Sequence, residues 1–336
     1  MKTLSRIVVF VVSCLVIGSC SLINFPSESQ APHHLPEVNE EYKVVWELSN
    51  IRIDNNDRRS MIVSSPGKIV FEGWKDEKSL VLTAIDSLSG DVLWQKPIYS
   101  SSGYLISQDK VVYRGTFGDA ELQTYDADTG DMLWENKLSG AHSVTELYST
   151  TDKLFIFTGN DKFLILDAEG EILEIRSEPY RTFLENNGRL YRNRNSSFEL
   201  FDTSTQKVVW DVNIEDRFTH SPVFDNGKIY LRTWAVPTEI YSIDDVTGTV
   251  DWKVSYDVVS NLCVLKTRIY FLTLDGNLVA IDRLSGNEVS KVKLSPAFDH
   301  TKQIGGYFVA ADSLNNVLAI SFGDNAQIMG LKITNP

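Results

Sequence analysis

One short motif recurs along most of the 336-residue chain. An Asp at the end of a short apolar run is followed by Gly four residues later and by Trp eight residues later. Complete and partial copies are Asp86, Gly90 and Trp94; Asp126, Gly130 and Trp134; Asp244, Gly248 and Trp252; Asp202 and Trp210; Asp282 and Gly286; and a shortened copy at Asp167. The leading Asp residues are 40, 41, 35, 42 and 38 residues apart. A repeat of this length, without a helical pattern between copies, predicts a β-propeller with one four-stranded blade per repeat.

Each residue type in the motif has a physical role in such a blade. The Asp side chain can accept hydrogen bonds from the backbone of the turn that follows it. Gly adopts a positive φ without a Cβ clash. The Trp lies on the next strand and is large enough to fill the gap between neighbouring blades. These side chains are therefore expected to build the architecture, and they carry no chemistry of their own.

The two ends of the repeat region are complementary. The tail, residues 317–321 and 328–332, matches the second and third strands of a blade and then stops. Residues 42–48 carry a Trp but follow no Asp-Gly turn, so they can supply the missing fourth strand and leave no open sheet edge. We therefore predict an all-β fold, a seven-bladed propeller in one domain over residues 42–336. An eighth blade would need strands in residues 50–60 or 295–305, whose polarity disfavours them.

The N-terminus has the features of an export signal. Lys2 and Arg6 precede an apolar stretch, residues 7–16, which is too short to span a bilayer. The sequence Ile-Gly-Ser-Cys ending at Cys20 is similar to a bacterial lipobox, in which the Cys is acylated. We predict a signal peptide over residues 1–19, lipidation of Cys20 and a flexible tether over residues 20–41. The protein is then extracytoplasmic and anchored by lipid to the cell membrane or outer membrane of a bacterium.

The charge balance excludes a nucleic-acid partner. The chain has 32 Lys and Arg against 45 Asp and Glu, and its net charge is −13. Binding to phosphates requires basic residues concentrated on one face, which this composition disfavours.

The repeat resembles that of the PQQ-like, quinoprotein-type β-propeller family, whose pattern is roughly Ala-x-Asp-x-x-Thr-Gly-x-x-x-Trp. That family includes quinoprotein dehydrogenases and a BamB-like branch of non-catalytic lipoproteins. The dehydrogenases are longer, hold Ca²⁺ and a catalytic Asp, and in one group contain a disulfide between adjacent cysteines. This chain has no adjacent Cys pair and uses most of its Asp residues in turns. The resemblance therefore implies a protein without a cofactor and without enzymatic activity.

Two groups of side chains are candidates for binding a partner. The first is a basic cluster in an acidic protein: Arg181, Arg189, Arg192 and Arg194. Arg192 and Arg194 share one face of a predicted strand, and the alternative to docking is charge balance against Glu178, Glu185 and Glu199. The second group is Trp74 and Trp234, which lie outside the repeat position and are either binding anchors or core residues.

Three histidines are weak candidates for a metal site. His142, His220 and His300 each precede the first strand of a predicted blade, in connections that share one face of the ring. Because these blades are not neighbours, separate loop positions are the simpler interpretation, and we predict no metal.

These observations favour a monomeric, lipid-anchored scaffold that binds an envelope protein or peptide. Two alternatives remain open: a dehydrogenase or sensor that binds PQQ or another small ligand, and a propeller that binds polysaccharide through exposed Trp residues.

Overall fold

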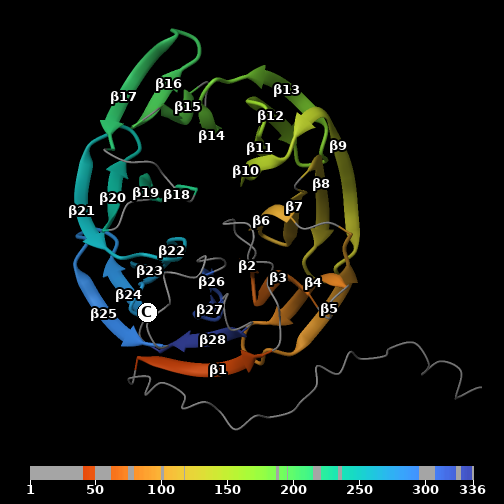
Figure 1. Cartoon of the computed structure of the whole chain (residues 1–336), viewed down its shortest axis with the longest axis vertical. Coiled ribbons are helices and arrows are strands. Elements are labelled where there is room, and N and C mark those ends of the chain that lie inside the picture. The colour runs from red at the N-terminus through yellow and green to blue at the C-terminus, as the bar shows by residue number, and fades with distance from the viewer. Residues whose placement is uncertain are drawn as a thin grey trace, which may run out of the picture. The chain divides into compact units, whose positions relative to one another are not determined.

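The computed structural model describes residues 41–49, 62–74, 79–99, 102–116, 118–186, 189–194, 196–214, 221–233, 237–294, 307–322 and 327–334. The predicted signal peptide, Cys20 and most of the predicted tether lie outside the described residues, as do residues 50–60 and 295–305. The described strands form seven four-stranded sheets arranged as a ring (Figure 1). The ring belongs to one compact unit, Pro36–Pro336. The predicted seven-bladed propeller is confirmed.

Each blade is an antiparallel meander whose first strand lies nearest the centre of the ring (Figure 1). Blade 1 consists of β2 (Ile62–Ser65), β3 (Lys68–Trp74), β4 (Leu80–Asp86) and β5 (Val92–Pro97). Blade 2 consists of β6 (Ser102–Gln108), β7 (Val111–Thr116), β8 (Asp119–Asp126) and β9 (Met132–His142). Blade 3 consists of β10 (Val144–Ser149), β11 (Lys153–Thr158), β12 (Lys162–Asp167) and β13 (Ile172–Ser177).

The second half of the ring repeats this plan. Blade 4 consists of β14 (Arg181–Asn186), β15 (Arg189–Arg194), β16 (Ser197–Asp202) and β17 (Lys207–Asn213). Blade 5 consists of β18 (Val223–Asp225), β19 (Lys228–Arg232), β20 (Thr238–Asp244) and β21 (Val250–Tyr256). Blade 6 consists of β22 (Cys263–Leu265), β23 (Arg268–Leu272), β24 (Asn277–Asp282) and β25 (Glu288–Lys293). Blade 7 consists of β26 (Phe308–Asp312), β27 (Val317–Phe322), β28 (Gln327–Ile333) and β1 (Tyr42–Leu48).

Blade 7 joins the two ends of the repeat region, as the sequence predicts. The register of β1 against β28 runs from Tyr42 opposite Ile333 to Leu48 opposite Ile328. Just outside this ladder, the Thr334 amide donates a hydrogen bond of 2.9 Å to the carbonyl of Glu41. Closure therefore depends on pairing between the first and the last described strands of the chain.

The core lies between the blades. The second and third strands are buried almost throughout, as in β11, β12 and β27. They read as continuous apolar runs because both faces of each sheet pack against neighbouring blades.

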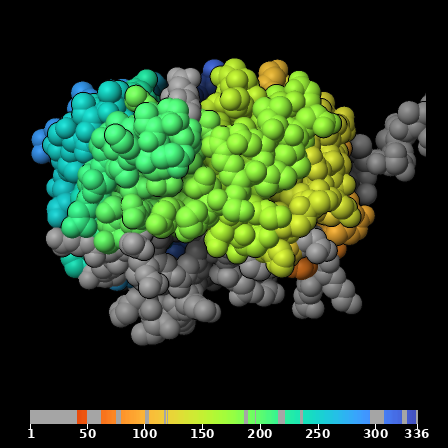
Figure 2. Space-filling model, turned by 90° about the horizontal axis from the view of Figure 1, so that it is seen from above, coloured from red at the N-terminus to blue at the C-terminus, as the bar shows by residue number. Residues whose placement is uncertain are grey.

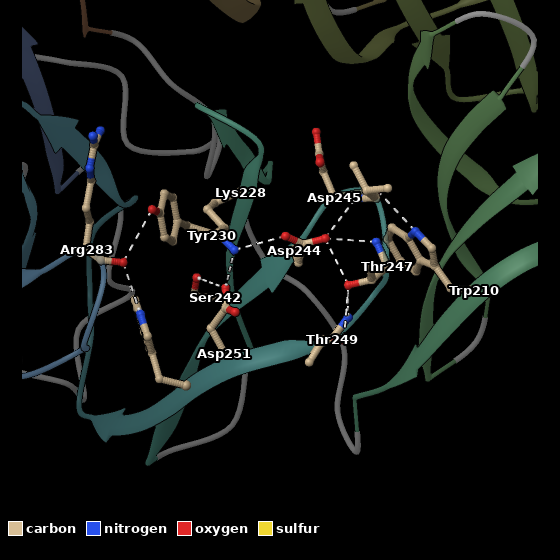
Figure 3. Close-up of polar contacts among 12 residues, drawn as sticks. Trp210, Lys228, Tyr230, Ser242, Asp244, Asp245, Thr247, Thr249, Asp251 and Arg283 are labelled. Carbon is tan, nitrogen blue, oxygen red and sulfur yellow. Dashed lines mark hydrogen bonds and ion pairs between the residues drawn. The ribbon is translucent and has the colours of Figure 1, made fainter.

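The motif latches one blade to the next, and Figure 3 shows the copy in blade 5. Asp244 Oδ1 accepts the backbone N–H of Thr247 at 2.9 Å. Trp210, on the outer strand of blade 4, donates from Nε1 to the carbonyl of Asp245 at 3.2 Å. Gly248 has a φ of 72°, and a Cβ built there would lie 2.6 Å from the Trp210 ring. The turn of one blade is thus shaped to receive the Trp of the preceding blade.

The same latch occurs at five of the seven seams between blades. The indole N–H groups of Trp46, Trp94, Trp134, Trp210 and Trp252 donate to the carbonyls of Ser87, Ala127, Ala168, Asp245 and Arg283. Each accepting residue directly follows the leading Asp of its repeat.

Polar contacts connect the two seams that lack the Trp. Between blades 3 and 4, Arg176 of β13 forms an ion pair with Glu185 of β14 at 2.7 Å. Arg176 also pairs with Glu174 of its own strand, at 2.5 Å. Between blades 6 and 7, the hydroxyl of Tyr42 is hydrogen-bonded to that of Ser290. Burial raises the pKa of Tyr42 to about 12, so this hydroxyl stays protonated at physiological pH.

Candidate functional site

The four arginines of the predicted basic cluster lie on β14 and β15, in different environments. Arg189 and Arg194 are exposed at the two ends of β15. Arg192 is buried, and its guanidinium carbon lies 3.7 Å from the centre of the Phe201 ring. Arg192 and Arg194 both approach the ring of Tyr180, at 5.1 and 5.4 Å, so the structure brings these two together.

Acidic side chains neutralise the buried arginine of this cluster. Arg192 Nε lies 2.6 Å from Glu199, and its Nη1 lies 3.7 Å from Glu178. The third predicted acidic partner, Glu185, pairs with Arg176 of blade 3 instead. Pairing of this kind favours charge balance for Arg192 over docking of an acidic partner.

Arg181 lies on the innermost strand of blade 4 and contacts the innermost strand of blade 3. It forms an ion pair with Glu146, a buried carboxylate on the innermost strand of blade 3. Glu146 also accepts hydrogen bonds from Tyr104 of blade 2 at 3.0 Å and from Ser221, which precedes blade 5, at 2.5 Å. One carboxylate thus connects the inner strands of blades 2, 3 and 4 with the segment that precedes blade 5, and Arg181 is part of that network.

The other predicted candidates are dispersed. Trp74 is half-buried at the end of β3 and packs against an apolar cluster of blades 1 and 2. His142 is exposed at the end of β9. Trp234, His220 and His300 lie outside the described residues. Among the described residues, no group of His, Cys, Asp or Glu is arranged to hold a metal ion.

The outer strands of the blades carry a feature that we did not predict. Each has a β-bulge just before the Trp position. The bulged residue is an exposed aliphatic side chain in five blades: Leu93, Leu133, Leu173, Val209 and Val289. Bulges twist an edge strand and re-aim its side chains, which protects a sheet edge from pairing with other chains.

Beyond the bulge, blade 3 differs from the other six blades. The residue after the Trp position is polar or charged in those blades: Glu47, Gln95, Glu135, Asp211, Lys253 and Lys291. In blade 3 this residue is Ile175, which is 50% exposed, and the Trp position holds Glu174. Charged side chains at this position discourage a further strand from pairing, so blade 3 lacks a protection that its neighbours have.

The strand β13 is consequently the most exposed apolar edge in the described ring. Its outer edge is unpaired because β13 pairs only with β12. Three of its six residues are exposed aliphatic side chains: Ile172, Leu173 and Ile175. Figure 2 shows this side of the ring, with blade 3 in yellow-green and blade 4 in green. An alignment of the repeat copies, compared at the residue after the Trp position, identifies Ile175 as the one apolar residue there.

The repeat and the fold define the class of protein, a PQQ-like β-propeller. The strand β13 is a candidate docking edge on it. A family model described as outer membrane protein assembly factor BamB matches residues 43–179 and 180–329, so the chain belongs to that family. The crystal structure of BamB from Moraxella catarrhalis has a similar fold, with a TM-score of 0.51 and 13% sequence identity. That match covers 88% of this chain and 98% of the other. No curated protein matches the sequence.

No helix in the described ranges combines the length and the apolar character that crossing a bilayer requires.

Proposed function

We propose that this protein is a lipid-anchored, non-catalytic scaffold of the bacterial envelope, and that it docks a partner protein on the outer strand of blade 3. The model of its family is described as an outer membrane protein assembly factor, which supports a role in holding other envelope proteins. The docking site is inferred from the exposed Ile175, which stands where each of the other six blades has a polar or charged residue.

The chemistry of β13 fits a partner that adds a strand to the sheet. Residues Glu174–Ser177 pair with β12 in a regular register along one edge of β13. No described strand pairs with the other edge. An added strand would be held by backbone hydrogen bonds and would be selected by the side chains that it meets. Leu173 and Ile175 supply apolar contacts for that strand, whereas Arg176 is occupied by Glu174 and Glu185.

Substitution of Ile175 by Lys tests this site. Ile175→Lys gives blade 3 the residue found at the same position in blades 5 and 6. We expect affinity purification of the full-length protein from detergent-solubilised membranes to recover a stoichiometric partner, and the Ile175→Lys variant to lose about 90% of it, a tenfold change.

The matched control is Asp211→Lys, the same position in blade 4. It should leave recovery of the partner unchanged, and both variants should keep the unfolding midpoint of the wild type because both sites are exposed. Equal recovery with Ile175→Lys and wild type would show that β13 is not the docking strand.

Replacement of Cys20 tests the anchor separately. Because several acyl chains hold a protein stably on a bilayer, the wild-type protein should sediment with membranes. The Cys20→Ser variant is expected to move to the soluble extracytoplasmic fraction. Persistence of this variant in the membrane fraction after a salt wash would contradict the lipid anchor.

A further inference from the structure

One face of the ring carries both the entry point of the chain and an unusual set of apolar turns. In an antiparallel meander, the turns between strands one and two and between strands three and four lie at the same end of the blade. We call this end of the ring the turn face. The Ile333 amide donates to Asn316 of the β26–β27 turn, and the Thr334 amide donates to Glu41. Glu41, through which the chain reaches β1, therefore lies on the turn face at blade 7.

Exposed aliphatic side chains occupy Asp turns on the turn face around that entry point. Val246 of blade 5, Leu284 of blade 6, Leu314 of blade 7 and Leu88 of blade 1 are 68, 72, 67 and 39% exposed. Each lies two residues after an Asp whose carboxylate accepts its backbone N–H. That hydrogen bond fixes the backbone of the turn, so these side chains are held at the surface of a rigid element.

Blade 7 carries its Asp turn between different strands from the other three blades. Its third and fourth strands come from opposite ends of the chain, so no turn joins them. The Asp turn lies instead between β26 and β27, where Asp312 accepts the N–H of Leu314 at 3.0 Å. Asn315 of this turn donates to the hydroxyl of Ser87 in blade 1 at 2.9 Å, which holds the two turns together.

The opposite arc of the turn face is polar. The corresponding positions in blades 2, 3 and 4 are Asp128, Glu169 and Ser204, all exposed. Exposed cations lie on both arcs, at Lys266 on the apolar arc and at Lys110 and Arg189 on the polar arc. The two arcs therefore differ in apolar character, and the aliphatic arc is the part of this face that fits a lipid surface.

We propose that the turn face of blades 5, 6, 7 and 1 rests on the lipid surface to which the chain is anchored. This inference rests on the lipid anchor at Cys20 proposed above. The arc needs only a weak affinity for lipid. The anchor keeps the ring close to the bilayer, so the effective concentration of lipid at the arc is high. Contact through this arc orients the ring, and β13 of blade 3 lies outside the contacting arc.

The test uses the full lipidated chain reconstituted into vesicles of phosphatidylethanolamine and phosphatidylglycerol that contain nitroxide-labelled lipid. A fluorophore is attached to Leu284→Cys, Leu88→Cys or, as the control on the polar arc, Asp128→Cys. Cys263 does not compete for the label, because burial raises its pKa to about 12 and keeps the thiol protonated. We expect nitroxide quenching at positions 284 and 88 to exceed that at position 128 several-fold.

The outcomes separate this inference from the anchor. Flotation of the protein with the vesicles and equal quenching at all three positions would leave the anchor intact and overturn the oriented contact. A partner protein on this face would give the same equal quenching in these vesicles, which contain no other protein. Failure of the wild-type chain to float with the vesicles would overturn both the anchor and the contact.

Discussion

Replacing Glu72 by Gln is expected to lower the free energy of unfolding by about 3–5 kcal/mol, the cost of leaving a buried charge without its counter-ion. Glu72 of β3 and Arg114 of β7 form an ion pair of 2.6 Å between blades 1 and 2, and each side chain is only 1% exposed. Arg114 donates a further bond of 2.7 Å to Gln123. Urea-induced unfolding of the purified domain measures the effect.

An exposed ion pair at the same seam provides the control. Lys96 and Asp131 are 3.1 Å apart, with exposed fractions of 35 and 72%. Asp131→Asn should lower the free energy of unfolding by less than about 1 kcal/mol, because solvent already screens the pair. The double variant Glu72→Leu with Arg114→Met should recover much of the loss from Glu72→Gln, since both charges are then removed. Equal effects of Glu72→Gln and Asp131→Asn would contradict this account.

The second large effect is expected at Gly130, where a turn meets the Trp of the preceding blade. Gly130 has a φ of 71°, and a Cβ built there would lie 2.5 Å from the Trp94 ring. Gly130→Ala should cost about 1–2 kcal/mol for the left-handed backbone. Displacing the packed indole should cost about 1–3 kcal/mol more.

Gly227 separates these two costs. Its φ is 74°, and a Cβ there would meet only Asp245 Oδ1, at an ordinary 3.7 Å. Gly227→Ala should therefore show the backbone cost alone. Thermal unfolding of the two variants measures the difference, and an identical fall in midpoint would mean that the Trp latch does not constrain Gly130.

The architecture could be predicted because it depends on local signals that recur. The turn carboxylates, the positive-φ glycines and the indoles determine the conformation of only a few neighbouring residues. Each copy of the motif therefore predicts the same turn and the same following strand. The ring closure could be predicted because residues 317–332 match only the second and third strands of a blade, while residues 42–48 carry Trp46 without a preceding Asp-Gly turn. The pairing of β1 with β28 confirms it. The PQQ-like, BamB-like family is confirmed by the family model.

The environments of the arginines could not be predicted, because they depend on contacts between blades. Strand parity predicts that Arg192 and Arg194 share one face of a strand, and both lie on β15 near the Tyr180 ring. Parity does not reveal that Glu178 reaches Arg192 from the connection between blades 3 and 4, or that Arg181 meets Glu146 inside the ring. Ile175, on the proposed docking edge, was not predicted because it lies outside the Asp, Gly and Trp positions that define the repeat.

Site-specific photo-cross-linking in intact cells tests the central claim most directly. A photoreactive residue is placed at the bulge and at the following position of the outer strands, with Leu173 and Ile175 in blade 3 and Leu133 and Glu135 in blade 2. The account predicts one strong adduct with a partner of fixed mass from positions 173 and 175 and little or none from 133 and 135. Equal adducts from both blades, or none from blade 3, would contradict a scaffold that docks its partner on β13.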